Sequence, residues 1–398
     1  MTDAARPVVR RARRAAHLFF RLSDDLLPDI GRLLRGQVEL VRQTRLLAVS
    51  VLTGKECAIS LDELRFLSTL PVDRWMPVAD LPVDLGVLQR LAREGFVVCD
   101  DEAGELAELR RRDDRLAESG WSDYAALYHS QSRWRDVDVG RSFDVAPPPP
   151  DAPEPPPHFH ASSQALQTIE LPLVTRDEGL FRLLSERRTT RSFDPAAPLT
   201  REELSLVLYY TFGCHGFARL GDGIVVLKRT SPSGGSLHPI EVYPLVVGVE
   251  EVDAGLYHYR TDQHALELVD PLDTDSARKR LVEFAAGQTY LATAPVLLIM
   301  TARFSRSFWK YRGSSRNYAV LLMDAAHLSQ TLYLVCGALG LGAFVSAAVN
   351  DGNIADRLGL DSFEEDVLAV CGCGRPACER DSFDVEFQPY VPRETLID

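Results

Sequence analysis

Two adjacent side chains near residue 310 could carry out proton transfer. Lys310 and Tyr311 offer an amine and a phenol side by side, just ahead of a long apolar helix pattern. A lysine acts as a base near neutral pH only where burial or neighbouring positive charge favours its neutral form, and Arg306, Arg312 and Arg316 can supply that charge. We therefore expect Lys310 and Tyr311 to be an acid/base pair beside a buried cofactor.

A second candidate segment, residues 187–191, reads Arg-Arg-Thr-Thr-Arg. In an extended chain, residues i, i+2 and i+4 point to the same side. Arg187, Thr189 and Arg191 can then converge on one dianion, such as the terminal phosphate of a nucleotide or flavin. A solvated run of arginines would have the same sequence, so both interpretations stay open for this segment taken alone.

The third candidate is the loop at residues 230–239, which reads Thr-Ser-Pro-Ser-Gly-Gly-Ser-Leu-His-Pro and lies between two strand patterns. It is longer than a simple hairpin turn requires. Glycines let a flat ligand approach the backbone closely, and serines and loop amides supply hydrogen-bond donors. The residues expected to line the ligand are Ser231, Pro232, Ser233, Gly234 and Gly235. No Gly-x-Gly-x-x-Gly or Gly-Lys-Ser/Thr motif is present, which argues against a Rossmann site or a P-loop.

The elements that position these segments are helices and strands in alternation. Residues 319–339 form an apolar helix pattern that contains Asp324, His327 and Gln330 and is followed by glycines, so we expect a core helix and not a membrane span. His327 is more simply a hydrogen-bonded core histidine than a catalyst. Ser60 with Glu63 and Thr200 with Glu203 have capping-box spacing, which predicts two helix starts. Residues 255–259 and 265–269 have strand patterns that predict a hairpin.

Composition excludes several classes of protein. With 45% hydrophobic and 25% charged residues, the 398-residue chain has the balance of a globular protein of two or three domains. A formal net charge of −13 opposes binding to nucleic acid or to an anionic membrane. Seven cysteines without dense spacing fit a reducing cytosol, and no signal-peptide pattern is present. We expect a cytoplasmic protein, with the arginines between residues 10 and 21 on a solvated basic face.

Cys371, Cys373 and Cys378 form a cysteine-rich segment near the end of the chain. Cys-x-Cys-x4-Cys could bind zinc with a fourth ligand such as His215, or hold a redox disulfide. No sequence-near fourth ligand exists, and small residues also suit close packing at the end of a strand. We predict no metal site.

A proline-rich stretch divides the chain. We predict a winged-helix-like module at 1–104, a helical connector at 105–145, a proline-rich linker at 146–160 and the main domain at 161–398. The small module could clamp a peptide by adding it as a strand, could be purely structural, or could read DNA. Its second helix offers Arg90 and Arg93 against several acidic residues, which is poor chemistry for DNA.

Taken together, the segments described above and the run Asp324-Ala-Ala-His327-Leu-Ser-Gln330 resemble the nitroreductase superfamily. Within it, they are similar to the SagB-type dehydrogenases that oxidise azoline rings to azoles in ribosomally made peptides. The resemblance implies an α+β fold in three α/β/α layers around a mixed, mainly antiparallel sheet. It covers about residues 180–380, with Thr189 and His238 where serine and tyrosine are usual.

The resemblance also implies roles for residues. Arg187, Thr189 and Arg191 would hold the phosphate and ribityl chain of FMN, the Ser231 to Gly235 loop would line its ring, and Arg375 would contact the cofactor. Lys310 and Tyr311 match a catalytic pair. The implied protein is a homodimer that works with a precursor peptide and a cyclodehydratase. An NAD(P)H-dependent nitro or quinone reductase and a non-catalytic peptide- or DNA-binding regulator are the alternatives.

Overall fold

The structure is a computed structural model. It describes residues 10–28, 30–37, 40–142, 158–159, 161–220, 224–378, 384–385, 387–388 and 390–392. The chain forms two compact units. Unit 1 comprises Met1–Arg133, Arg303–Leu321 and Asp361–Asp366, and unit 2 comprises Trp134–Ala302, Leu322–Leu360 and Val367–Asp398.

Unit 1 contains two three-stranded antiparallel sheets, ordered β5-β1-β6 and β2-β3-β4. The strands are β1 (Arg11–Arg14), β2 (Leu18–Pro28), β3 (Leu40–Ser50), β4 (Glu56–Ala58), β5 (Met76–Pro77) and β6 (Val97–Cys99). The helices are α1 (Ile30–Leu33), α2 (Leu61–Thr69), α3 (Leu85–Arg93), α4 (Glu105–Glu118), α5 (Asp123–Ser132) and α10 (Phe304–Phe308).

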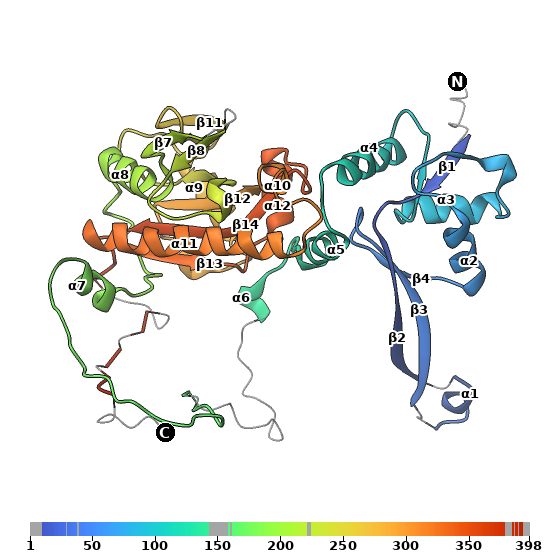
Figure 1. Cartoon of the computed structure of the whole chain (residues 1–398), viewed down its shortest axis with the longest axis horizontal. Helices are drawn as coiled ribbons and strands as arrows, with labels where there is room; N and C mark the ends of the chain where they lie inside the picture. The colour runs from blue at the N-terminus through green and yellow to red at the C-terminus, as the bar shows by residue number, and fades with distance from the viewer. Residues whose placement is uncertain are drawn as a thin grey trace. The chain divides into compact units, whose positions relative to one another are not determined.

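Local chemistry explains where the helices of the small module begin. Ser60 accepts a hydrogen bond from the Glu63 amide and Glu63 accepts one from the Ser60 amide, so the predicted capping box opens α2. Asp84 caps α3 by accepting from the Gly86 amide at 2.7 Å. Both helices bury their apolar faces in one core, to which Phe66, Leu91 and strand β6 contribute. In Figure 1, β2 and β3 extend from this core as a two-stranded ribbon with α1 at its tip.

The predicted solvated basic face is wrong for Arg13. Arg13 lies in the middle strand of its sheet with only 6% of its surface exposed, and it pairs with Asp113, which is fully buried. Its guanidinium also contacts Asp114 at 2.6 Å and lies 5.1 Å from the Trp75 ring. Burial raises the pKa of the Asp113 carboxyl, while Arg13 opposes that rise.

Unit 2 is built on a six-stranded sheet with the order β11-β10-β9-β12-β14-β13. The strands are β7 (Gly216–Arg219), β8 (Val225–Lys228), β9 (Ile240–Val246), β10 (Gly255–Arg260), β11 (Ala265–Pro271), β12 (Val296–Arg303), β13 (Gly342–Ser346) and β14 (Glu365–Gly374), of which β7 and β8 form a separate hairpin. The helices are α6 (Val139–Ser142), α7 (Gly179–Glu186), α8 (Arg201–Phe212), α9 (Thr274–Phe284), α11 (Arg316–Ala338) and α12 (Asp351–Leu358). The pairs β11/β10, β10/β9, β9/β12 and β14/β13 are antiparallel.

Helices cover both faces of this sheet. Leu281 of α9 and Ile354 of α12 join one buried cluster with Val370 of β14. Cys373, three residues further along β14, points to the opposite face and contacts Cys336 of α11. Figure 1 shows α11 lying across β13 and β14. The unit is therefore layered helix, sheet, helix.

The observed elements confirm a mixed α+β fold with a small N-terminal module. The predicted helices after Ser60 and Thr200 and the predicted hairpin at 255–269 are present. Strands β1 and β2 and helices α10 and α12 were not predicted. Residues 146–157 of the expected linker lie outside the described residues, and the division of the chain into four segments stays a prediction.

Helix α11 is the one helix in the described part of the chain that is long and apolar enough to cross a membrane, with a mean hydropathy of 1.3 over its most apolar window. Core helices of soluble proteins meet the same criterion, and one such helix is weak support for a span.

We predict that Arg13→Met lowers the free energy of unfolding by about 3 kcal/mol at neutral pH, because it leaves the Asp113 carboxylate buried without its cation. A carboxyl with a raised folded-state pKa favours folding most when protonated, so the difference between mutant and parent should shrink as pH falls through that pKa. Chemical denaturation at several pH values measures this. Arg65→Met, which removes an exposed pair with Asp62, is the control, and an equal loss in both variants would contradict the assignment.

Candidate functional site

The glycine-containing loop is fixed to one side of helix α11. The Asp324 carboxylate, 4% exposed, accepts hydrogen bonds from the Ser233 hydroxyl at 2.6 Å and the Gly234 amide at 3.1 Å. The Ser231 hydroxyl bonds with the Thr331 hydroxyl at 2.6 Å, seven residues and about two helical turns further along. Asp324 therefore acts as the anchor of the loop.

The same loop has an unusual backbone. Gly235, Ser236 and His238 have φ values of 64°, 58° and 47°, so two non-glycine residues adopt the left-handed conformation. Such residues cost about 1 kcal/mol or more each and persist only where the surroundings hold them. Here the Ser236 hydroxyl and His238 Nε2 both bond to the Leu227 carbonyl of β8, at 3.2 and 3.1 Å.

A cavity of about 450 Å³ opens between this loop and the β7–β8 hairpin. Its lining includes Phe217, Lys228, Arg229, Ser231, Ser233 and His238. Serine hydroxyls, backbone amides and an aromatic ring suit a flat polar ligand.

The arginine segment forms a second cavity, on another side of α11. The Arg187 guanidinium lies 5.3 Å from the Tyr333 ring, and the Thr189 hydroxyl bonds with the Tyr333 hydroxyl at 3.2 Å. Arg187 and Tyr333 line a cavity of about 390 Å³ together with Arg188, Thr190, Gly337 and Gly342. We call this the arginine cavity. Two guanidinium groups around one space suit a phosphate dianion.

Glycine is required where the arginine segment meets β13. The Thr190 amide bonds to the Ala343 carbonyl at 2.8 Å, which holds the segment beside the strand. A Cβ on Gly342 would lie 2.6 Å from the Thr190 side chain. The close approach of the two chains therefore fixes the floor of the arginine cavity.

Two predicted cofactor ligands lie elsewhere in unit 2. Arg191 is not among the residues that line the arginine cavity, and its amide binds the Asp384 carboxylate at 2.7 Å. Arg375 forms an ion pair with Glu203 at 2.7 Å. Burial opposes a low pKa for Glu203, but the Thr200 amide and Arg375 together lower the pKa of that carboxyl.

The loop and the arginine segment contact different sides of the same helix. Asp324 and Tyr333 are nine residues apart, which is about two and a half turns of an α-helix, so they lie on opposite sides of it. Thr331 and Tyr333 are two residues apart and differ by about 200°. The two anchoring points therefore lie on opposite sides of a helix that, with its side chains, is about 10 Å across.

Lys310 and Tyr311 belong to unit 1. Lys310 Nζ lies 5.5 Å from the centre of the Tyr311 ring. The preceding helix α10 packs on Trp121, whose ring centre lies 4.7 Å from Phe304 and 4.6 Å from Phe308. The Gly313 amide bonds to the Gly120 carbonyl at 2.8 Å. The segment that carries the proposed acid/base pair is thus packed on the α4–α5 connection.

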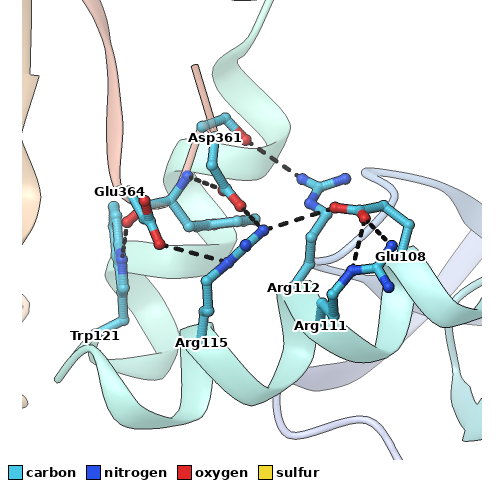
Figure 2. A network of polar contacts seen from close by, with 9 residues as sticks. Glu108, Arg111, Arg112, Arg115, Trp121, Asp361 and Glu364 are labelled. Carbon is cyan, nitrogen blue, oxygen red and sulfur yellow. Dashed lines mark hydrogen bonds and ion pairs between the residues drawn. The ribbon is translucent and has the colours of Figure 1, made fainter. Parts of the chain in front are cut away.

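A polar network holds Trp121 in place (Figure 2). The Trp121 indole N–H donates to the Phe363 carbonyl at 3.0 Å. Arg115 of α4 pairs with Asp361 and, at 3.5 Å, with Glu364. Two residues that the sequence does not mark as functional, Trp121 and Arg115, therefore support the Lys310–Tyr311 segment.

Cys336, Cys371 and Cys378 lie in different environments. Hydrogen bonding to Cys373 and burial raise the pKa of the Cys336 thiol, and burial raises that of Cys371. Cys378 is exposed. No group of three or more metal-binding side chains occurs in the part of the chain that the structure describes.

Sequence reasoning missed Tyr333 and Asp384 as neighbours of the arginine segment. It also missed Arg188 as a residue that lines the arginine cavity. Tyr333 is an aromatic residue in an apolar helix, which is more often a packing residue. Its role becomes visible only when residues 187–189 are seen beside it.

We predict that Asp324→Ala releases the loop, because the Gly234 amide loses its acceptor. A lost buried acceptor costs about 1–3 kcal/mol, so amide hydrogen exchange at Gly234 should accelerate about tenfold or more. Mass spectrometry of exchange across residues 230–239 measures this. Gln330→Ala, on the exposed side of the same helix, is the control, and unchanged protection in Asp324→Ala would contradict the anchoring role.

Comparison with known proteins identifies relatives. Residues 184–375 match the Nitroreductase family. MJ1384 of Methanocaldococcus jannaschii, which is named as a nitroreductase, is 30% identical over 200 residues, or 49% of this chain and 92% of its own length.

Two further relatives are named as processing proteins. The trifolitoxin-processing protein TfxB of Rhizobium leguminosarum bv. trifolii is 33% identical over 36% of this chain and 39% of its own length. The microcin B17-processing protein McbC of Escherichia coli is 33% identical over 34% of this chain and 50% of its own length. The chain therefore matches half or less of the length of these two proteins.

A structure of the E. coli microcin synthetase McbBCD complex with truncated pro-MccB17 bound aligns with a TM-score of 0.49 and 21% identity, over 69% of this chain and 99% of that chain. The sequence relationship to MJ1384 covers nearly all of that protein. The predicted resemblance is confirmed, and this chain belongs to the nitroreductase family.

Proposed function

We propose that this protein is an FMN-dependent dehydrogenase that oxidises azoline rings to azoles in a ribosomally made peptide. Family membership supports an oxidoreductase, and similarity to TfxB and McbC supports a peptide substrate. The observation that carries the proposal is the pair of ligand-type segments, one basic and one rich in hydroxyls and amides, that are both anchored on α11.

The residues present fit FMN. Arg187, Arg188 and the Thr189 hydroxyl would hold the phosphate, because guanidinium groups bind its oxygens in pairs. The Ser231 to Gly235 loop would contact the ring, since its hydroxyls and amides match ring carbonyls and nitrogens. Arg191 and Arg375 stay candidates for contacts to the rest of the cofactor. When bound, FMN would supply the hydride acceptor of the reaction.

We propose that a second copy of the chain completes each flavin site. The arginine cavity and the Ser231 to Gly235 loop lie on opposite sides of α11, so the arginine cavity of one copy would meet the loop of the other. The outward side of α11 is suited to such an interface, because Leu322 and Met323 are 42% and 56% exposed. Next to it, Leu206 and Tyr210 of α8 and Leu334 and Val335 of α11 line an apolar cavity of about 360 Å³.

Lys310 and Tyr311 would handle the proton. Oxidation of an azoline removes a proton from the acidic ring carbon as a hydride leaves the neighbouring carbon. Lys310 Nζ would accept that proton, and the Tyr311 hydroxyl would orient the ring or pass the proton on. The packing of α10 on Trp121 would keep both side chains in position.

The partners follow from this chemistry. A precursor peptide carries the azoline, and a cyclodehydratase must make it, so we propose that both act with this protein in the cytoplasm. The McbBCD structure is of a complex with truncated pro-MccB17 bound. We further propose that the small module is winged-helix-like and clamps the peptide.

A small-molecule reductase is the second candidate. The relationship to MJ1384, named as a nitroreductase, favours it. Such an enzyme would oxidise NAD(P)H with a nitro compound or quinone and would need no peptide. Steady NAD(P)H consumption without any peptide would favour this reading, and a flavin spectrum would count against a non-catalytic regulator.

We predict that the purified protein removes two hydrogen masses from an azoline-containing peptide, as seen by mass spectrometry. Lys310→Ala should keep its flavin and lose this activity by about 100-fold or more, because general base catalysis is worth that much. Arg187→Ala should lose the flavin itself, as measured by absorbance after gel filtration. Lys279→Ala, an exposed lysine on α9, is the control. Full activity in Lys310→Ala would contradict the role of Lys310 as proton acceptor. Full flavin content in Arg187→Ala would contradict phosphate binding in the arginine cavity.

A further inference from the structure

A cavity of about 680 Å³ lies in unit 2, and none of the residues proposed above for flavin or catalysis lines it. Its walls come from the first half of α8, the loop at 250–252 and the β10–β11 hairpin. Figure 1 shows α8 and β11 on the same part of the unit. None of its lining residues is shared with the arginine cavity or with the cavity beside the Ser231 loop.

The floor of the cavity is apolar and aromatic. Leu204 and Leu208 of α8 are 1% and 2% exposed, and Tyr257 and Tyr259 of β10 are 8% and 1% exposed. The Tyr257 hydroxyl is occupied by the Asp253 carbonyl at 2.8 Å, so its ring and not its hydroxyl is available to a ligand. Leucine side chains and tyrosine rings can accept an aliphatic stem, and tyrosine faces attract cations.

The rim of the cavity is acidic. Glu202, Glu250 and Glu251 contribute three carboxylates, and Arg201 contributes the one guanidinium among the lining residues. Arg201 pairs with Glu251 at 3.2 Å. The side-chain carboxylates of Glu202 and Glu250 make no hydrogen bond or ion pair with any residue that the structure describes. The lining therefore has a net formal charge of −2 with two carboxylates unpaired.

A hydrogen-bonded chain fixes the wall opposite α8. His264 Nε2 bonds with the Ser205 hydroxyl at 2.8 Å, and His264 Nδ1 bonds with the Tyr259 hydroxyl at 2.7 Å. Burial raises the pKa of Tyr259 to about 12, so its hydroxyl keeps its proton at neutral pH. These hydrogen bonds join α8 to the β10–β11 turn, where His264 adopts a left-handed φ of 48°. The wall is therefore preformed without a ligand.

We propose that this cavity binds an alkyl cation, an ammonium or guanidinium group on an aliphatic stem, as in a lysine or arginine side chain. The stem would lie on the leucines and tyrosines of the floor, and the cation would replace water beside Glu202 and Glu250. An anion would meet two unpaired carboxylates, and a neutral apolar group would leave them uncompensated. The proposal is independent of the flavin chemistry, because it uses no residue assigned to it.

Binding can be measured on the full-length protein by NMR titration with methyl labels on leucine, which report on Leu204, Leu208 and Leu266 of the cavity. The probe is a blocked five-residue peptide with one arginine between glycines, and its neutral match carries citrulline. Free n-butylguanidinium is the second probe, which separates a side chain in a peptide from a free small molecule. We expect the arginine probe to shift the cavity methyl groups and to bind about tenfold more tightly than citrulline, with an affinity that falls as salt rises.

Charge variants test the rim directly. Glu202→Gln combined with Glu250→Gln should weaken the arginine probe about tenfold, whereas Arg201→Gln should strengthen it about threefold, because it removes the competing cation. Glu102→Gln combined with Glu105→Gln makes the same change in net charge on unit 1 and should leave binding unchanged. Equal binding of arginine and citrulline, or an equal effect of both double variants, would overturn the proposal. If the arginine peptide binds and n-butylguanidinium does not, the cavity is a site for peptide side chains. If both bind, the cavity is a site for alkyl cations in general.

Discussion

Helix α11 constrains everything else in unit 2. It covers one face of the six-stranded sheet through Cys336 and β14, and it anchors two ligand-type segments on sides of the helix that lie about half a turn apart. On our proposal that both segments bind FMN, the helix between them means that a single chain would offer two half-sites and not one complete site. The exposed apolar side of α11 gives a physical reason for a second copy to supply the missing half.

Unit 1 contributes in a different way. The segment Arg303–Leu321 belongs to it, and the Trp121 cluster with Phe304, Phe308 and Phe363 fixes that segment. Presentation of Lys310 and Tyr311 therefore depends on the packing around Trp121.

Patterns with a short range were predictable from sequence. Both capping boxes, the hairpin at 255–269 and the loop at 230–239 follow from local spacing. Contacts between distant residues were not predictable: Arg13 meets Asp113 a hundred positions away, and Thr189 meets Tyr333. Alternation predicts that Arg187, Thr189 and Arg191 share one side, but Arg188 and Thr190 line the arginine cavity with Arg187, and the Thr190 amide bonds to β13.

Mixing two inactive chains tests the shared site most directly. Arg187→Ala damages the arginine cavity and Asp324→Ala damages the Ser231 to Gly235 loop. If each site combines the cavity of one copy with the loop of the other, a mixed dimer would hold one intact site and one doubly damaged site. After partial unfolding and refolding together, the account predicts that about a quarter of the sites recover FMN, since half of randomly paired dimers are mixed. Flavin content no higher than the average of the two separate variants would contradict it.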